Sequence, residues 1–300
     1  GFDEKAIFGV DQFLMRGGTI IIASSPFDVS TGDALSIEES ETGLEEWLLH
    51  NGISVEKSLV LDKSNMPFPV PVDRNIGGFV IQETKLVDYP YFVDIRADAT
   101  SKAGMVSGLD QVTFSWGSPI NLEKGHNRDV KIEKILESSA ESWASTSLIV
   151  QPDYEEHGDF GFKVPDEMEK RLLGVSIEGE FESYFKNRNN PFELDVVEEL
   201  EKSSEEASTE ILYKKILKSP ENAKIIFFSS NTFVSDVMLD LASSAMGTRY
   251  DTPADLMYNA VDWSLEEVGL LSIRGRGQFI KTLPSLSTSG KMFLEYFNYF

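Results

Sequence analysis

Residues Thr19–Ala23 read TIIIA, and a second run of the same kind, KIIFFS, occupies residues 224–229. Both runs are apolar without alternation and rich in β-branched or aromatic residues, which is typical of a strand buried on both faces in a parallel sheet. Because the runs lie near opposite ends of the chain, we predict that the two outer thirds contribute strands to one sheet.

Helical patterns lie beside both runs. Apolar residues at helical spacing fill Glu4–Met15, and the capping box Thr42-Gly43-Leu44-Glu45 starts a second helix that closes at Asn51-Gly52. Two more helices are predicted late in the chain, over residues 235–246 and from Thr252-Pro253 onward. This alternation of helix and strand predicts an α/β protein with an open, doubly wound and mainly parallel sheet.

The middle of the chain is less regular. It has one helical pattern, at residues 129–137, and acidic residues crowd the stretch 178–222. Strand or extended patterns occur at residues 58–61, 66–71, 79–82, 148–151 and 173–177. We predict one domain over residues 1–281 with an irregular acidic insertion around 178–222, followed by a separate segment over 282–300. Because the first element is a helix, a strand and a whole domain are expected upstream of Gly1.

The composition excludes several classes of function. Of the 300 residues, 50 are acidic and 27 are basic, and the net charge of −23 repels the phosphate backbone of nucleic acids. The chain has no cysteine, so disulfides, thiolate zinc sites and thiol nucleophiles are excluded. It also contains no apolar run of about 18 residues, the length that a membrane-spanning helix requires.

Motifs for nucleophilic, nucleotide or metal chemistry are absent from the sequence. There is no Gly-x-Ser-x-Gly elbow, no P-loop, and no Gly-x-Gly-x-x-Gly after a predicted strand. The three histidines, His50, His126 and His157, lie in different polar segments and are expected to be ordinary surface residues. We therefore expect no cofactor, no metal and no catalytic activity.

One carboxylate pair keeps an enzymatic alternative open. If Val175 and Ile177 face one side of a strand, then Glu178 and Glu180 face the other, with backbones roughly 7 Å apart. Glycosidases use two carboxylates at comparable separations, so a glycan-acting hydrolase is the alternative function. The other interpretation of Glu178 and Glu180 is an exposed acidic edge.

Polar residues follow both two-sided strands. Ser24 and Ser25 come after the first run, and Ser229, Ser230 and Asn231 lie at and after the end of the second. Ligands of open α/β sheets bind beyond the carboxyl ends of the strands, so these five residues form the predicted ligand site. The competing interpretation, which we favour, is that Asn231 or Thr232 caps the following helix.

The end of the chain differs in charge from the rest. Arg274, Arg276, Lys281 and Lys291 stand against Glu295 alone, and an aromatic, amphipathic stretch follows them. Basic residues followed by aromatics are typical of a chain that approaches a bilayer. The alternative is a helix that docks on the domain itself.

Four segments together resemble the auxiliary components of ABC transporters related to gliding motility, the Gld-type family. They are VDQFLMRGG at residues 10–18 with the strand and Ser25-Pro26-Phe27 behind it, residues 43–53, VSIEGEFESYF at residues 175–185, and NAVDW at residues 259–263 with LLSIR at 270–274. Their order and spacing cover nearly the whole chain.

This resemblance implies a region on the periplasmic face of the membrane, held there by transmembrane helices outside the chain. It also implies a three-layer sheet similar to the class I glutamine-amidotransferase-like fold, without its catalytic cysteine. The implied function is a non-catalytic module of a membrane-anchored transporter protein. Its implied partners are ABC permease and ATPase subunits, a solute, or envelope glycans.

Overall fold

The computed structural model describes most of the chain. The described residues are 1–31, 35–76, 79–96, 104–106, 108–123, 125, 130–192 and 215–265. The membrane-proximal residues predicted from the sequence, Arg274, Arg276, Lys281 and Lys291, lie outside these ranges, as does His126. Among the described residues, no helix combines the length and apolar character needed to cross a membrane.

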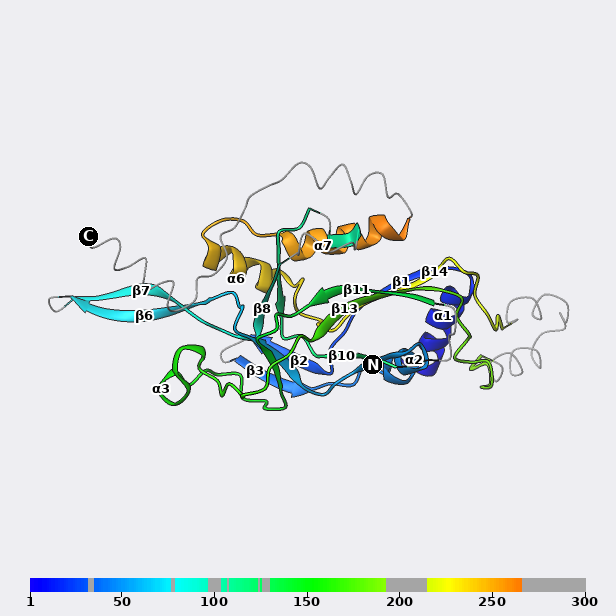
Figure 1. The fold of residues 1–300 in the computed structure, drawn as a ribbon, viewed down its shortest axis with the longest axis horizontal. Helices are drawn as coiled ribbons and strands as arrows, with labels where there is room; N and C mark the ends of the chain where they lie inside the picture. Colours follow the sequence, from blue (N-terminus) through cyan, green and yellow to red (C-terminus); the bar gives the residue numbers. More distant parts are fainter. Residues whose placement is uncertain are drawn as a thin grey trace, which may run out of the picture.

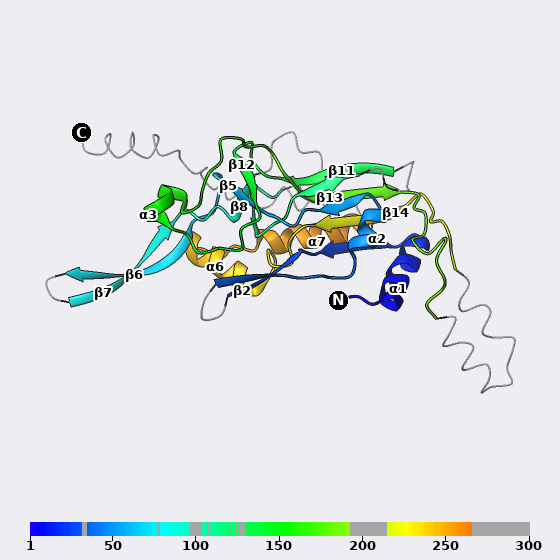
Figure 2. The same cartoon turned by 90° about the horizontal axis from the view of Figure 1, so that it is seen from below.

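A four-stranded sheet forms the centre of the molecule, in the order β1-β14-β13-β11. Strands β1 (Thr19–Ala23) and β14 (Ala223–Phe228) pair in parallel, whereas β13 (Leu172–Gly179) and β11 (Val130–Glu137) complete the sheet in antiparallel pairings. Figure 2 shows the four strands side by side. The two runs that the sequence singled out are therefore direct neighbours, which confirms that the outer thirds share one sheet.

Helices cover both faces of this sheet (Figure 1). On one face, side chains of β1 and β14 pack with α1 (Glu4–Met15) and α2 (Glu45–His50). On the other face, alternate residues of the same strands pack with α7 (Thr252–Ser264). Burial on both sides explains why neither strand shows alternation between apolar and polar residues.

The remaining described strands form five two-stranded antiparallel sheets. Their strands are β2 (Phe27–Thr31) with β3 (Leu35–Glu39), β4 (Ile53–Val55) with β10 (Ile120–Leu122), β5 (Leu59–Asp62) with β12 (Ser142–Ser145), β6 (Phe68–Ile76) with β7 (Phe79–Val87), and β8 (Phe92–Arg96) with β9 (Gln111–Ser115). Residues of β2, β3, β5 and β12 contribute to a third apolar cluster, whereas β4 and β10 pack on the α1 and α2 side and β8 and β9 pack mainly on the α7 side. Helix α6 (Asp236–Met246) packs against this third cluster, and the short helices are α3 (Tyr154–His157), η1 (Gly104–Val106) and η2 (Gly158–Phe160).

The predicted α/β class is confirmed, but the prediction of a mainly parallel sheet is wrong. Among the described strands, the β1–β14 pairing alone is parallel, and the other seven pairings are antiparallel. Helices on both faces bury a strand whatever its direction, so two-sided burial does not fix the direction of its neighbours. The α/β sheet of this chain is mixed.

Two local predictions fail as well. Residues 129–137 were expected to be helical, yet Val130–Glu137 is strand β11. A bulge between Lys134 and Leu136 breaks the alternation of the strand, so that the adjacent residues Ile135 and Leu136 are both buried, as they could be on one face of a helix. Residues 148–151, expected as a strand, lie outside every assigned strand. The helices at 4–15, 45–50, 236–246 and 252–264 are confirmed.

Candidate functional site

A pocket of about 410 Å³ opens beyond the carboxyl end of β1. Its volume falls in the range of sites for small molecules. Leu48, Ile53 and Phe227 give it an apolar lining, and Ser24 and Ser25 lie where β1 ends. The other lining residues come from the turn before α2, from α2 and from the segment around β4: Pro26, Ser40, Glu41, Thr42, Glu45, Glu46, Leu49, Ser54, Val55 and Lys57.

The start of α2 fixes one wall of this pocket. The carboxylate of Glu45 accepts hydrogen bonds from the Thr42 backbone N–H at 2.7 Å and from its hydroxyl at 2.9 Å, as the capping-box pattern predicted. Burial raises the pKa of Glu45, but these and other backbone hydrogen bonds outweigh it and leave that pKa below its ordinary value. Glu45, the first residue of α2, is therefore ionised and hydrogen-bonded to the turn before the helix.

The pocket combines unpartnered hydroxyls with an acidic rim. In the described part of the chain, the hydroxyls of Ser24, Ser40 and Ser54 make no hydrogen bond, so they remain available to a ligand. Three carboxylates, those of Glu41, Glu45 and Glu46, lie on the rim against a single lysine, Lys57. This lysine pairs with Glu39 at 3.3 Å, and Glu46 pairs with Arg188 at 3.2 Å. Glu41 and Glu45 keep the rim of the pocket acidic, which is unfavourable to anions.

A buried carboxylate supports the pocket wall from behind. Asp11 of α1 accepts hydrogen bonds from Trp47 Nε1 at 3.2 Å, the Ser183 hydroxyl at 2.6 Å and the Tyr184 backbone N–H at 2.9 Å. A fourth bond comes from the Gln12 side-chain amide at 3.1 Å. Asp11 thereby joins α1, α2 and the segment after β13 in one network. Sequence reasoning missed this role, although an Asp-Gln pair inside an otherwise apolar helix face was a visible signal.

The structure separates the two halves of the predicted ligand site. Ser24 and Ser25 line the pocket, and the Ser25 hydroxyl also accepts a hydrogen bond from the Phe27 backbone N–H at 3.1 Å. Ser229 and Ser230 are instead fully buried, and their hydroxyls donate to the backbone carbonyls of Leu173 at 3.1 Å and Ser115 at 2.7 Å. These two serines crosslink β14 to neighbouring segments.

Asn231 does not have the cap role that was favoured for it. It is exposed, and its side-chain amide donates to Asp28 Oδ1 at 2.9 Å. The cap of α6 is Ser235, whose hydroxyl accepts from the Met238 backbone N–H at 3.4 Å. The expectation that Asn231 or Thr232 caps the helix is therefore wrong, because the cap position is taken by Ser235, directly before the first residue of α6.

Glu178 and Glu180 are both engaged with lysines. Glu178 lies 3.7 Å from the buried Lys224, which also sits 4.6 Å from the centre of the Trp263 ring. Glu180 forms an ion pair with Lys218. Neither carboxylate lines the pocket described above. The surroundings of this pair are those of structural ion pairs.

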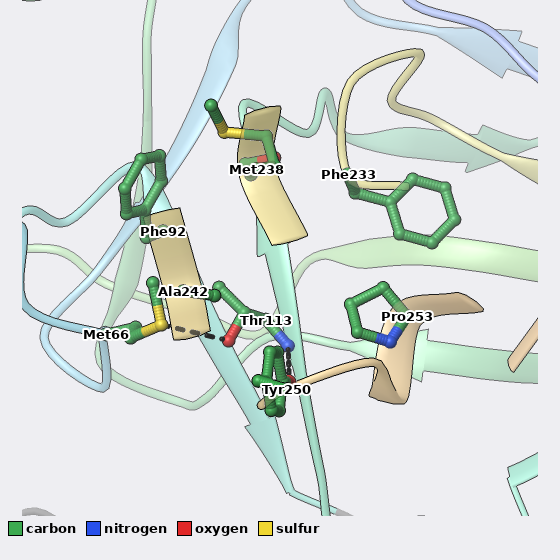
Figure 3. A pocket seen from close by; sticks show the side chains of 9 residues that line it. Met66, Phe92, Thr113, Phe233, Met238, Ala242, Tyr250 and Pro253 are labelled. Atoms are coloured by element: carbon green, nitrogen blue, oxygen red, sulfur yellow. Dashed lines mark hydrogen bonds between the residues drawn. The ribbon is translucent and has the colours of Figure 1, made fainter. Parts of the chain in front are cut away.

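A second hollow lies between β8, β9 and the helices α6 and α7, and Figure 3 shows its lining. Its volume of about 10 Å³ holds at most one water molecule. The Tyr250 hydroxyl accepts from the Thr113 backbone N–H at 2.8 Å and donates to the Gln111 carbonyl at 3.1 Å. Burial raises the pKa of Tyr250 to about 12, so it keeps its proton at physiological pH. This hollow is a packing gap.

Asp94, on β8, makes the stability of the fold depend on pH. Burial raises its pKa, and the Arg96 guanidinium, 2.9 Å away, offsets this only in part. An aspartate in an unfolded chain has a pKa of about 3.9. At pH values between this pKa and the higher pKa of folded Asp94, the folded chain binds more protons than the unfolded chain. The contribution of Asp94 to the free energy of unfolding therefore falls as the pH rises through this window.

We expect Asp94→Asn, which does not titrate, to gain stability relative to the parent chain as the pH rises. Urea unfolding between about pH 4 and pH 7 measures this difference, because the linkage follows from bound protons. Whichever chain is the more stable at pH 4, the free energy of unfolding of the variant minus that of the parent should increase with pH. A value that stays constant or falls as the pH rises would contradict the assignment.

The described residues contain no group of three or more histidine, aspartate or glutamate side chains placed to hold a metal ion. His50 contacts the Glu182 carbonyl at 2.8 Å, and His157 lies 4.0 Å from Glu156.

Comparison with known proteins identifies the family of the chain. Residues 1–263 match the model of a family described as an ABC-type uncharacterized transport system. An uncharacterized protein of Borreliella burgdorferi is 24% identical over 190 residues, which are 62% of this chain and 35% of that protein, so the chain corresponds to about a third of this relative. No solved structure matches. The Gld-type subgroup and the amidotransferase-like fold stay predictions. Because the family model spans most of its length, the chain belongs to the family of auxiliary components of ABC-type transport systems.

Proposed function

We propose that this chain is a non-catalytic accessory module of an ABC transport system, and that it holds a small solute in the pocket between β1 and α2. Family membership supports the transport role. The observation that carries the binding role is the pocket itself, in which unpartnered hydroxyls face an apolar lining at the carboxyl end of β1. Helices on both faces of the sheet and the absence of cysteine fit an amidotransferase-like fold without its nucleophile.

The chemistry of the pocket defines the class of solute. Hydroxyls of Ser24, Ser40 and Ser54 donate and accept hydrogen bonds, which suits a compound rich in hydroxyl or amino groups. The apolar lining from Leu48, Ile53 and Phe227 suits one uncharged face of such a compound. Carboxylates on the rim oppose an anion. The solute is therefore an uncharged or cationic molecule of about sugar size.

The module acts on the outer face of the cell membrane, held by segments outside this chain, with ABC permease and ATPase subunits as its partners. Supporting this arrangement is the family itself, whose transport systems operate at a membrane. The strongly acidic composition suits an exposed module that stays dispersed in solution.

The test compares solute classes on the 300-residue chain by thermal shift, followed by titration calorimetry. Uncharged sugars or amines are expected to raise the melting temperature, whereas carboxylates and phosphates are not. Ser24→Trp, which fills the pocket, should weaken binding by about ten-fold or more, because a ligand loses over 1.4 kcal/mol when its contacts are blocked. Ser36→Trp, on the exposed part of β3, is the matched control and should bind normally. Equal affinity in the parent and in Ser24→Trp would refute the pocket assignment.

A further inference from the structure

A long hairpin projects from the body of the molecule. Strands β6 and β7 pair over nine residues each and reach away from the rest of the fold (Figure 1). Its base is fixed, because the Phe68 ring lies 5.6 Å from that of Phe92 and 5.3 Å from that of Tyr89. The hairpin is therefore anchored to the body at its base.

The far end is apolar and exposed. Phe79, Val80 and Ile81 are 78%, 66% and 50% exposed, and they follow one another at the start of β7. Single exposed apolar residues are common on protein surfaces and need no explanation. Three in succession at the end of a projecting arm form an apolar patch that spans both faces of the hairpin, and exposed apolar patches mark interaction sites.

Both faces of the hairpin contribute to this patch. Side chains alternate along a strand, so Phe79 and Ile81 lie on one face and Val80 on the other. In the register of the pair, Phe79 stands opposite Ile76 and Val80 opposite Asn75. A flat protein surface would cover one face and leave the other in water. A medium that surrounds the tip covers both.

We propose that the β6–β7 hairpin inserts its tip into the interfacial layer of a lipid bilayer. Three strand residues span about 10 Å, which matches the depth to which interfacial elements bury their apolar side chains. The outer edges of a two-stranded hairpin keep unpaired backbone groups, and these limit the insertion to the hydrated interface.

The charge of the hairpin favours a lipid surface, rather than a second copy of the chain, as the partner of the tip. Residues 68–87 hold two acidic and two basic residues, Asp73, Glu83, Arg74 and Lys85, so this arm is neutral in a chain of net charge −23. Two copies would bring together two strongly acidic bodies, and like charge opposes that contact. A neutral arm that projects from the body lets an acidic protein touch a membrane while its charge stays at a distance.

The test is flotation of the 300-residue chain with phosphatidylcholine vesicles. We expect binding that does not weaken with added salt, and weaker binding to vesicles containing anionic lipid at low ionic strength. Phe79→Ser with Ile81→Ser should lower the partition coefficient by about ten-fold or more, because burial of two large apolar side chains is lost. Leu86→Ser, at an exposed position nearer the base, is the control and should bind like the parent.

A fluorescent residue reports the depth directly. Phe79→Trp should shift its emission to shorter wavelength with vesicles and be quenched by brominated lipid, whereas Leu86→Trp should show neither effect. Unchanged binding of the double serine variant would place the membrane contact elsewhere in the chain and overturn the proposal. Absence of vesicle binding by the parent chain would also overturn it. If the double serine variant then lost a co-purifying protein, or lost a dimer that the parent forms, the tip would be a contact site for that protein or for a second copy of the chain. Solute binding in the pocket is measured separately, so failure of either proposal leaves the other standing.

Discussion

Asp11→Ala is expected to lower the free energy of unfolding by about 3–5 kcal/mol, one of the two largest effects in the molecule. The carboxylate is almost fully buried and accepts four hydrogen bonds from α1, α2 and the segment after β13. Its removal leaves the Trp47 indole N–H and the Tyr184 backbone N–H buried without their acceptor. Each such orphaned donor costs about 1–3 kcal/mol.

Chemical denaturation of the parent and the variant measures this loss. Asp240→Ala, at an exposed position on α6, is the control and should stay within about 0.5 kcal/mol of the parent. Since α2 forms a wall of the pocket, Asp11→Ala should also weaken solute binding at temperatures where it remains folded. A loss below about 1 kcal/mol would show that the network around Asp11 does not hold α1 and α2 together.

Phe228→Ala is expected to cost a similar amount, about 3–5 kcal/mol, for a different reason. The ring is fully buried on the α7 side of the sheet and lies 5.5 Å from the ring of Phe233. Truncation removes apolar burial and leaves a cavity in a sheet that is covered on both faces, where the surroundings collapse poorly.

The matched control is the same substitution at the hairpin tip. Phe79 is 78% exposed, so Phe79→Ala should change the free energy of unfolding by no more than about 0.5 kcal/mol. Parallel urea titrations of both variants give the comparison. Equal losses would mean that the tip is buried in the folded chain, which contradicts both the core assignment and the projecting arm.

The sequence predicted the centre of the fold because its signals there are local. TIIIA and KIIFFS occur where β1 and β14 lie, and the hydrogen bonds between Thr42 and Glu45 form directly before α2, whose N-cap residue is Leu44. The direction of β13 and β11 was not predictable, because it depends on how the chain returns to the sheet. The bulge in β11 also gives its sequence an apolar pattern like that of a helix, and the strand is recognised only by its pairing with β13.

One wall of the candidate site could be predicted from the sequence, and the opposite walls could not. Ser24 and Ser25 follow a recognisable strand, and they do line the pocket. The opposite walls come from α2 and β4, and a sequence pattern does not say which strand end a helix packs beside. The hairpin had a missed signal of its own, since Gly77-Gly78 between two extended runs is typical of a two-residue hairpin turn.

Family membership gives the chain an accessory role in an ABC transport system. The most direct measurement is gentle detergent extraction of the natural full-length protein with an affinity tag, followed by identification of the proteins that co-purify. We expect recovery of an ABC permease and its ATPase in fixed ratio. The Ser24→Trp protein should form the same complex. Recovery of the tagged protein alone, while a known ABC transporter from the same extract stays assembled, would contradict this role.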